Sequence, residues 1–451
     1  MSRVRGAIRR RRPDVLALGL LLIAHAVRMR DFARIVAVDD STGLSESLEF
    51  GASSLWRVSG QGYFTLLRAP LLLVSWFNPW SWALLLFGMS LVAWWSASTA
   101  LYVLHRGDGV AWWRSLVVGA LPLMVPVRLA TYGDTTDVPF GLAYAHFPLA
   151  VVGACAWIAL VDGRAPRLGR PIALFLGLVG LTSPTTASVL LGASGVAWIA
   201  TSIGQGIPAA GRLVRHLGPS VVTLTTATAA QAIRWATRSR EAPAAWQALA
   251  QDYSPISHLR TVGLGRSLLG AGKSLGMSFL PDSMATWIRD RSDGTTTTLM
   301  LVAVTILLAI LAWRGGRRDP ASLSFLGVGI ATLAAQSIAK AGGQVRYMIV
   351  PFILVATGIT RTLWAGQSRD TSRWPGGRLA ATSVLVLWAA LFVTRFEVGA
   401  NDDQRVRSWR GNLLVARDEC VGRPDDTVIQ VRVTVKHPDD IGLVTTCGTI
   451  R

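Results

Sequence analysis

Residues 82–104 read WALLLFGMSLVAWWSASTALYVL, an apolar run that contains no charged side chain. A helix of roughly 20 such residues can cross the hydrocarbon core of a bilayer. The whole chain is 51% hydrophobic and 16% charged, and its mean hydropathy is +0.41. Similar runs recur along it, so we expect about eleven membrane-spanning helices, at 14–31, 82–104, 111–130, 141–161, 171–182, 185–203, 218–236, 296–313, 321–339, 346–364 and 379–396.

Basic residues are concentrated in short gaps between these apolar runs. The formal net charge is +19, and arginine supplies most of the positive charge. Because cytoplasmic loops of membrane proteins carry an excess of Lys and Arg, this pattern predicts membrane orientation and not a nucleic-acid partner. It places the N-terminus in the cytoplasm and the C-terminus outside. The clusters are Arg3, Arg5 and Arg9–Arg12; Arg164, Arg167 and Arg170; Arg314, Arg317 and Arg318; and Arg361, Arg369, Arg373 and Arg378.

The expected fold is therefore an all-α polytopic membrane protein over residues 1–399, with outer loops near 31–80 and 237–298. Residues 400–451 form a small extracytoplasmic segment, in which 428–435 alternates as a strand does. Cys420 and Cys447 both lie in this segment. Two cysteines in an oxidising compartment indicate a disulfide.

Asp39 and Asp40 are the most conspicuous candidates for chemistry, because they follow the first apolar run directly. Carboxylates near a bilayer surface are costly unless they face water or a cavity. One of them can act as a general base, and the other can orient substrate or hold a Mg²⁺ or Mn²⁺ ion. An ordinary polar turn is the alternative interpretation. The chain has no P-loop, HExxH or GxSxG motif.

Further polar residues follow in a characteristic order. Arg68 lies in an amphipathic stretch, Arg128 precedes a short loop with Asp134 and Asp137, His146 opens the next run, and Arg346-Tyr347 precedes Pro351. In this organisation residues 1–400 resemble the GT-C superfamily of membrane glycosyltransferases. Those enzymes carry a catalytic acid in the first outer loop and an Arg-Tyr followed by Pro at the start of a late span.

The resemblance implies a glycosyltransferase that uses a polyprenyl-phosphate sugar as donor. Asp39 or Asp40 would deprotonate an extracytoplasmic acceptor, which is a glycan, a lipid or a protein. Arg346 would stabilise the leaving phosphate, with Tyr347, Arg68 and Arg128 as further binding candidates. Asp134, Asp137 and His146 would contact the sugar or a metal. Membrane lipids are the other expected partner.

The preference for Arg over Lys, with abundant Ala and Gly, indicates the plasma membrane of a bacterium and a role in cell-envelope biogenesis. Two other classes stay open: a lipid-linked glycan ligase or polymerase, and a transporter or flippase. A ligase would use the arginine-containing loop 237–298, whereas a transporter places its functional charges inside spans.

Overall fold

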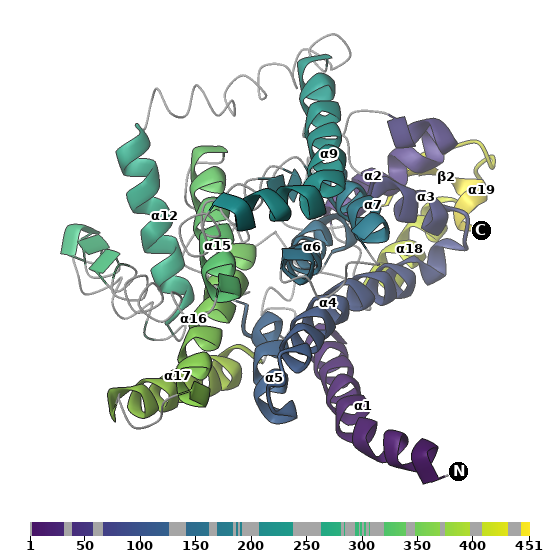
Figure 1. Ribbon diagram of the computed structural model, residues 1–451. Helices are drawn as coiled ribbons and strands as arrows, with labels where there is room; N and C mark the ends of the chain where they lie inside the picture. Colours follow the sequence, from purple (N-terminus) through teal and green to yellow (C-terminus); the bar gives the residue numbers. More distant parts are fainter. Residues whose placement is uncertain are drawn as a thin grey trace.

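The structure is a computed structural model of the whole chain, shown in Figure 1. The residues described below are 2–30, 38–56, 66–125, 141–161, 169–183, 207–237, 263–280, 320–339, 348–369, 375–396, 408–431 and 443–451, with a few isolated positions between 186 and 191 and between 284 and 306.

The described part of the chain is mainly helical. Its elements, in chain order, are α1 (Ser2–Met29), α2 (Val38–Phe50), η2 (Gly51–Trp56), α3 (Arg68–Ser75), η3 (Pro79–Ser81), α4 (Trp82–Gly107), α5 (Trp112–Gly119), η4 (Leu121–Met124), η6 (Leu142–Tyr144), α6 (His146–Val161), α7 (Gly169–Gly180), α9 (Ile207–Thr237), α12 (Leu264–Ser278), α15 (Pro320–Ala339), α16 (Ile349–Arg369), α17 (Pro375–Phe396), α18 (Trp409–Glu419), β1 (Val428–Val431), β2 (Leu443–Thr446) and α19 (Cys447–Ile450).

The prediction of about eleven membrane-spanning helices is wrong. Over the described ranges, one helical stretch, Pro79–Gly107, is long and apolar enough to cross a membrane; it has 29 residues and a mean hydropathy of 1.6. The apolar parts of α6, α7, α15, α16 and α17 are shorter, at 10–17 residues. The predicted spans 185–203 and 296–313 lie largely outside the described residues.

Local backbone chemistry explains why several apolar runs do not become long helices. The run 111–130 forms α5, which ends at Gly119 and gives way to the 3-10 turn η4. Pro122 lies in that turn and cannot donate a helical hydrogen bond. The run 141–161 starts with η6, so α6 begins only at His146. Helix α9 is long, but its sequence includes charged residues such as Arg215.

Polar contacts join the helices at the end of α4 near Gly107. Tyr102 donates a hydrogen bond to Asp14 of α1 over 2.5 Å, and Arg106 pairs with the same carboxylate over 2.7 Å. Asp108, which follows α4, forms an ion pair with Arg361 of α16. The basic residues here therefore bind neighbouring helices as well as marking helix ends.

The opposite end of α4 packs against the C-terminal segment, as Figure 1 shows for the yellow elements beside α2 and α3. Strands β1 and β2 are antiparallel, with Val428 opposite Thr446. Cys420 and Cys447 form a disulfide with Cα atoms 5.4 Å apart. Buried apolar side chains of the segment's described residues share one cluster with the first loop and α4: Leu44, Leu71, Trp82, Trp409, Leu413, Ile429, Leu443 and Ile450.

Helices α15 and α16 pack closely because glycines face each other's helix. A Cβ atom on Gly358 would lie 2.6 Å from Leu326 Cγ and 3.1 Å from the Ser322 carbonyl oxygen. A Cβ atom on Gly329 would lie 2.7 Å from Val355 Cγ2. Small residues at such contacts let two helix backbones approach.

We therefore expect Gly358→Ala to lower stability by about 1–3 kcal/mol, the usual cost of overpacking a core. Gly88→Ala in α4 is the matched control, because no atom lies within 4 Å of its added methyl group; it should be neutral or stabilise the helix by about 0.5–1 kcal/mol. Thermal unfolding followed by tryptophan fluorescence measures both. Equal melting temperatures for the two variants would contradict the close packing of α15 on α16.

Candidate functional site

The structure describes only part of the predicted site. The side chains of Asp40, Arg68 and His146 are described, whereas Asp39 is described only as backbone within α2. The remaining candidates lie outside the described residues: Arg128, Asp134, Asp137, Arg346 and Tyr347.

The acidic pair begins helix α2 instead of lying in an irregular loop. Asp39 and Asp40 are the second and third residues of this helix by its bounds, Val38–Phe50. The first turn of a helix has backbone N–H groups without helical partners and favours negative charge. The sequence therefore places both acidic residues in the first turn of α2, the next described helix after α1.

Asp40 joins α2 to the start of the α6 region. Its side chain is 1% exposed, and its Oδ2 atom accepts a hydrogen bond from the backbone N–H of Leu142 over 3.0 Å. Burying a carboxylate is expensive unless hydrogen bonds compensate for the lost water. The contact connects positions 102 residues apart, so it fixes α2 relative to a distant part of the chain.

His146 lies four residues beyond Leu142, at the first position of α6. Its ring is buried and packs against Phe147, with ring centroids 4.1 Å apart, and beside Tyr144 at 6.3 Å. The structure therefore brings Asp40 and the start of the helix that carries His146 to the same end of the molecule. The aromatic neighbours give His146 a packing role in this arrangement.

Arg68, the first residue of α3, makes contacts within the first loop. It is 3% exposed, donates a hydrogen bond to the Ser54 carbonyl over 2.7 Å and forms an ion pair with Glu46 of α2. These contacts hold η2, α2 and α3 together. The predicted role of Arg68 in binding phosphate finds no support in them, since this guanidinium is directed at its own loop.

The break after α7 also reaches this end. Leu66 donates its backbone N–H to the Leu181 carbonyl over 3.0 Å, and Gln231 of α9 donates to the same oxygen over 3.3 Å. The neighbouring Thr182 and Ser183 are buried. The segment after α7 is thus bonded both to α9 and to Leu66, which precedes α3.

Two buried arginines were missed by the sequence reasoning. Arg28 of α1 donates to the carbonyls of Pro122 and Val125, over 3.0 and 2.6 Å. Arg395 of α17 donates to the Met124 carbonyl over 2.9 Å. The sequence did contain a signal for these two arginines. Each lies at one end of an apolar run, and an arginine cluster lies at the other end of the same run.

These two guanidinium groups fix η4, the turn that leads into residues 126–140. Arg395 also donates to the carbonyl of Ser278, the last residue of α12, over 2.8 Å, and to that of Leu280, two residues beyond it, over 2.7 Å. Helices α1, α12 and α17 therefore meet at this turn. Through it they set the starting point of the segment that contains Arg128, Asp134 and Asp137.

The chemistry available among the described side chains is acid-base and hydrogen-bonding chemistry. A buried carboxylate at a helix start can accept a proton from a bound hydroxyl. Over the same residues, no group of three His, Cys, Asp or Glu side chains is arranged to hold a metal ion.

No protein-family model matches the chain, and no curated protein matches it.

We predict that Arg68→Met destabilises the first loop by about 1–3 kcal/mol, because it leaves the buried Ser54 carbonyl and Glu46 without this donor. Arg417→Met in α18 is the control, since Arg417 is half exposed and its nearest carboxylate oxygen is 4.0 Å away. Thermal unfolding of the purified proteins measures the difference. An unchanged melting temperature for Arg68→Met would show that this ion pair does not hold α2.

Proposed function

We propose that the chain is a membrane glycosyltransferase that resembles the GT-C superfamily and transfers a sugar from a polyprenyl-phosphate donor to an extracytoplasmic acceptor. One observation carries the proposal. The acidic pair opens a helix of its own directly after the α1 region, and the carboxylate of Asp40 is buried against the backbone of Leu142. An ordinary turn at the surface would leave the Asp40 carboxylate exposed to water.

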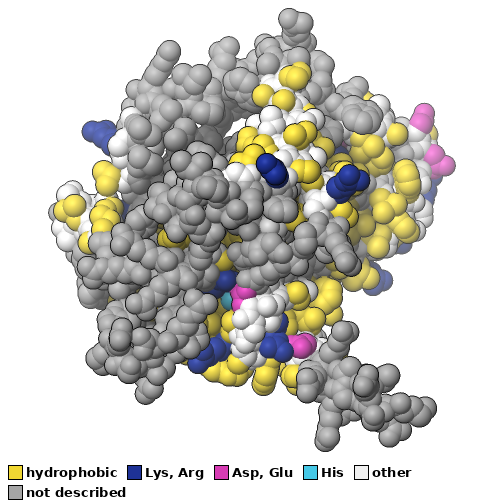
Figure 2. Space-filling model, viewed as in Figure 1, with side chains coloured by type: hydrophobic (Ala, Val, Ile, Leu, Met, Phe, Trp, Pro, Cys, Tyr) yellow, Lys and Arg dark blue, Asp and Glu magenta, His cyan; other side chains and the backbone are white. Residues whose placement is uncertain are grey.

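The surface of α1 supports a membrane location. Leu16, Leu20, Ile23 and Val27 are exposed and follow one another at helical spacing, whereas Leu21 on the other face is buried. Exposed apolar side chains of this kind mark a surface that contacts lipid or a partner. Leu84, Val92 and Val103 of α4 are also exposed, and Figure 2 shows apolar side chains over much of the coloured surface in view. The cell membrane of a bacterium is the location we propose.

The proposed reaction is a displacement at the anomeric carbon of the donor sugar. A carboxylate of the acidic pair takes the proton from an acceptor hydroxyl, and that oxygen forms a bond to the anomeric carbon. The bond between this carbon and the phosphate oxygen breaks, and its electron pair leaves with the polyprenyl phosphate. A cation stabilises the departing charge, and we assign this part to Arg346.

The two aspartates are proposed to divide the work. Asp40 is committed to the Leu142 N–H and holds α2 in place. Asp39 is then the candidate for the base. Asparagine at either position keeps an oxygen that accepts a hydrogen bond but cannot take up a proton as a carboxylate does, so amide substitutions separate positioning from proton transfer.

The experiment is sugar transfer in membranes from radiolabelled polyprenyl-phosphate sugars, with Asp39→Asn, Asp40→Asn and Asp40→Ala. We expect Asp39→Asn to reduce transfer by about 10²–10⁴-fold, the usual contribution of a general base. Asp40→Asn should retain most of the activity, and Asp40→Ala should lose both activity and stability. Glu49→Gln, an exposed carboxylate on the same helix, is the control.

If Asp40→Asn folds but loses sugar transfer, and Asp39→Asn transfers sugar normally, then Asp40 is the base and Asp39 has the positioning role. Full activity in both amide variants would place the base elsewhere, and arginine substitutions in the 237–298 loop would then test a ligase. Failure of every lipid-linked donor to support transfer by the wild type would overturn the proposal.

A further inference from the structure

We propose that the C-terminal segment positions the helix that carries the acidic pair, and that the Cys420–Cys447 disulfide makes this positioning sensitive to reduction. The C-terminal module is defined here as residues 408–431 and 443–451. The inference deepens the proposed function, since its consequence for sugar transfer rests on Asp39 and Asp40 acting at the site. The structural coupling itself can be measured without any donor.

A single hydroxyl group links α2 to strand β2. Ser45 Oγ accepts the backbone N–H of Val444 over 3.1 Å and donates to the Ser41 carbonyl over 2.9 Å. Ser41 directly follows Asp40 in α2. The outer edge of a two-stranded sheet has unpaired backbone groups, and α2 supplies a partner for one of them. Movement of β2 is therefore transmitted to the turn that contains Asp40.

The module is fixed to the start of α4 by a tryptophan. Trp409 donates from Nε1 to the Pro79 carbonyl over 2.7 Å and stacks on Trp82, with ring centroids 6.0 Å apart. Its side chain is buried, as are Leu44 of α2 and Leu443 of β2 in the same apolar cluster. The module thus lies between two parts of the chain, and α2 is packed against it by apolar contact as well as by the Ser45 hydrogen bond.

The disulfide holds together a unit whose described sheet is small. Each of its two strands has four residues, and a sheet of two short strands is at best marginally stable by itself. Both cysteines are fully buried, and the bridge connects positions 27 residues apart. Removing such a cross-link enlarges the set of unfolded conformations and weakens the folded form.

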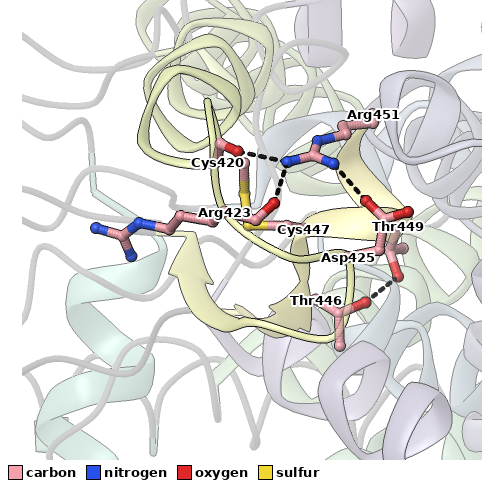
Figure 3. Close-up of a disulfide and its surroundings, with 7 residues drawn as sticks. All are labelled: Cys420, Arg423, Asp425, Thr446, Cys447, Thr449 and Arg451. Carbon is pink, nitrogen blue, oxygen red and sulfur yellow. Dashed lines mark hydrogen bonds and ion pairs between the residues drawn. A yellow bond between two sulfur atoms is a disulfide. The ribbon is translucent and has the colours of Figure 1, made fainter.

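Arg451 makes a further set of contacts beside the disulfide, as Figure 3 shows. Its guanidinium donates to the carbonyls of Cys420 and Arg423, over 2.5 and 2.6 Å, and forms an ion pair with Asp425. One of these carbonyls belongs to Cys420, which is itself half of the disulfide. The disulfide and the contacts of Arg451 together keep β2 next to α18. The outer edge of β2 then faces α2.

Three restraints consequently act on α2 from different directions. The Leu142 N–H holds Asp40, the ion pair with Arg68 holds Glu46, and the module holds Ser45. Opening the disulfide removes support from the third restraint only. We therefore expect α2 to loosen while the packing of α15 on α16 stays unchanged.

The test is hydrogen exchange on the purified full-length protein in detergent, before and after reduction with a phosphine, with thiol labelling to show that Cys420 and Cys447 are free. Peptides from 38–50 should exchange about tenfold faster after reduction, and peptides from 349–364 should not change. Unchanged exchange in 38–50, with both thiols free, would overturn the inference whatever happens within the module.

A substitution that leaves the disulfide intact provides the second arm. Ser45→Ala should also raise exchange in 38–50. Ser53→Ala is matched to it, because Ser53 is exposed and its hydroxyl makes a comparable backbone hydrogen bond, to the Phe50 carbonyl over 2.7 Å; it should have no effect. Equal effects of the two serine variants would overturn the role of Ser45.

A sugar-transfer assay distinguishes failure of this inference from failure of the proposed function. If the oxidised protein transfers sugar, reduction and Ser45→Ala should each lower the rate in parallel with the loosening of α2. A loosened α2 with an unchanged rate would overturn the positioning role. If the oxidised protein transfers no sugar from any lipid-linked donor while reduction still loosens α2, the proposed function fails and the coupling between module and helix stands.

Discussion

Guanidinium groups that bind backbone carbonyls at the ends of helical segments hold this structure together. Arg395 binds the carbonyls of Ser278 at the end of α12 and of Leu280 just beyond it, Arg28 binds those of Pro122 in η4 and of Val125 just after it, and Arg68 binds that of Ser54 in η2. The last carbonyls of a helix have no partner within it, and positive charge is favoured there. Each arginine satisfies such carbonyls while reaching from another element, so one side chain both caps a helix and fixes its position. Arg451 repeats the pattern at Cys420, which follows α18.

This use of arginine explains where the sequence could and could not predict the fold. Hydropathy correctly indicated helices in the apolar runs that the structure describes. The number of spans was wrong, because a hydropathy window does not detect where a helix ends. Pro122 and the η4 turn divide the run 111–130, and η6 delays the start of α6. Arginine clusters were interpreted only as markers of orientation, whereas Arg106 and Arg361 pair with Asp14 and Asp108 across helices. The disulfide was accessible to sequence reasoning because both cysteines fall in one short segment, and the structure has it.

The candidate site was predictable in composition but not in contacts. The adjacent aspartates stood out at once, since two carboxylates beside an apolar run need an explanation. Their partners did not, because Leu142 and Val444 contribute backbone N–H groups that carry no residue-specific signal. Arg68 was grouped with possible phosphate ligands, and only the folded loop reveals that it pairs with Glu46. Residues that act through backbone atoms of distant segments escape a pattern search, since neither periodicity nor spacing records them.

The position of α2 has to come from tertiary contacts. It has 13 residues, and isolated helices of this length are marginal in water. Gly43 lets it approach α3, because a Cβ atom there would lie 2.5 Å from Leu71 Cδ1. Hydrogen bonds from Leu142 to Asp40 and from Val444 to Ser45 hold it on other sides. A general base is effective only when it is held in a fixed geometry. The contacts that fix α2 come from the first loop, the start of α6 and the C-terminal module, so under the proposed function the acidic pair is held in place by the completed fold and not by an N-terminal fragment.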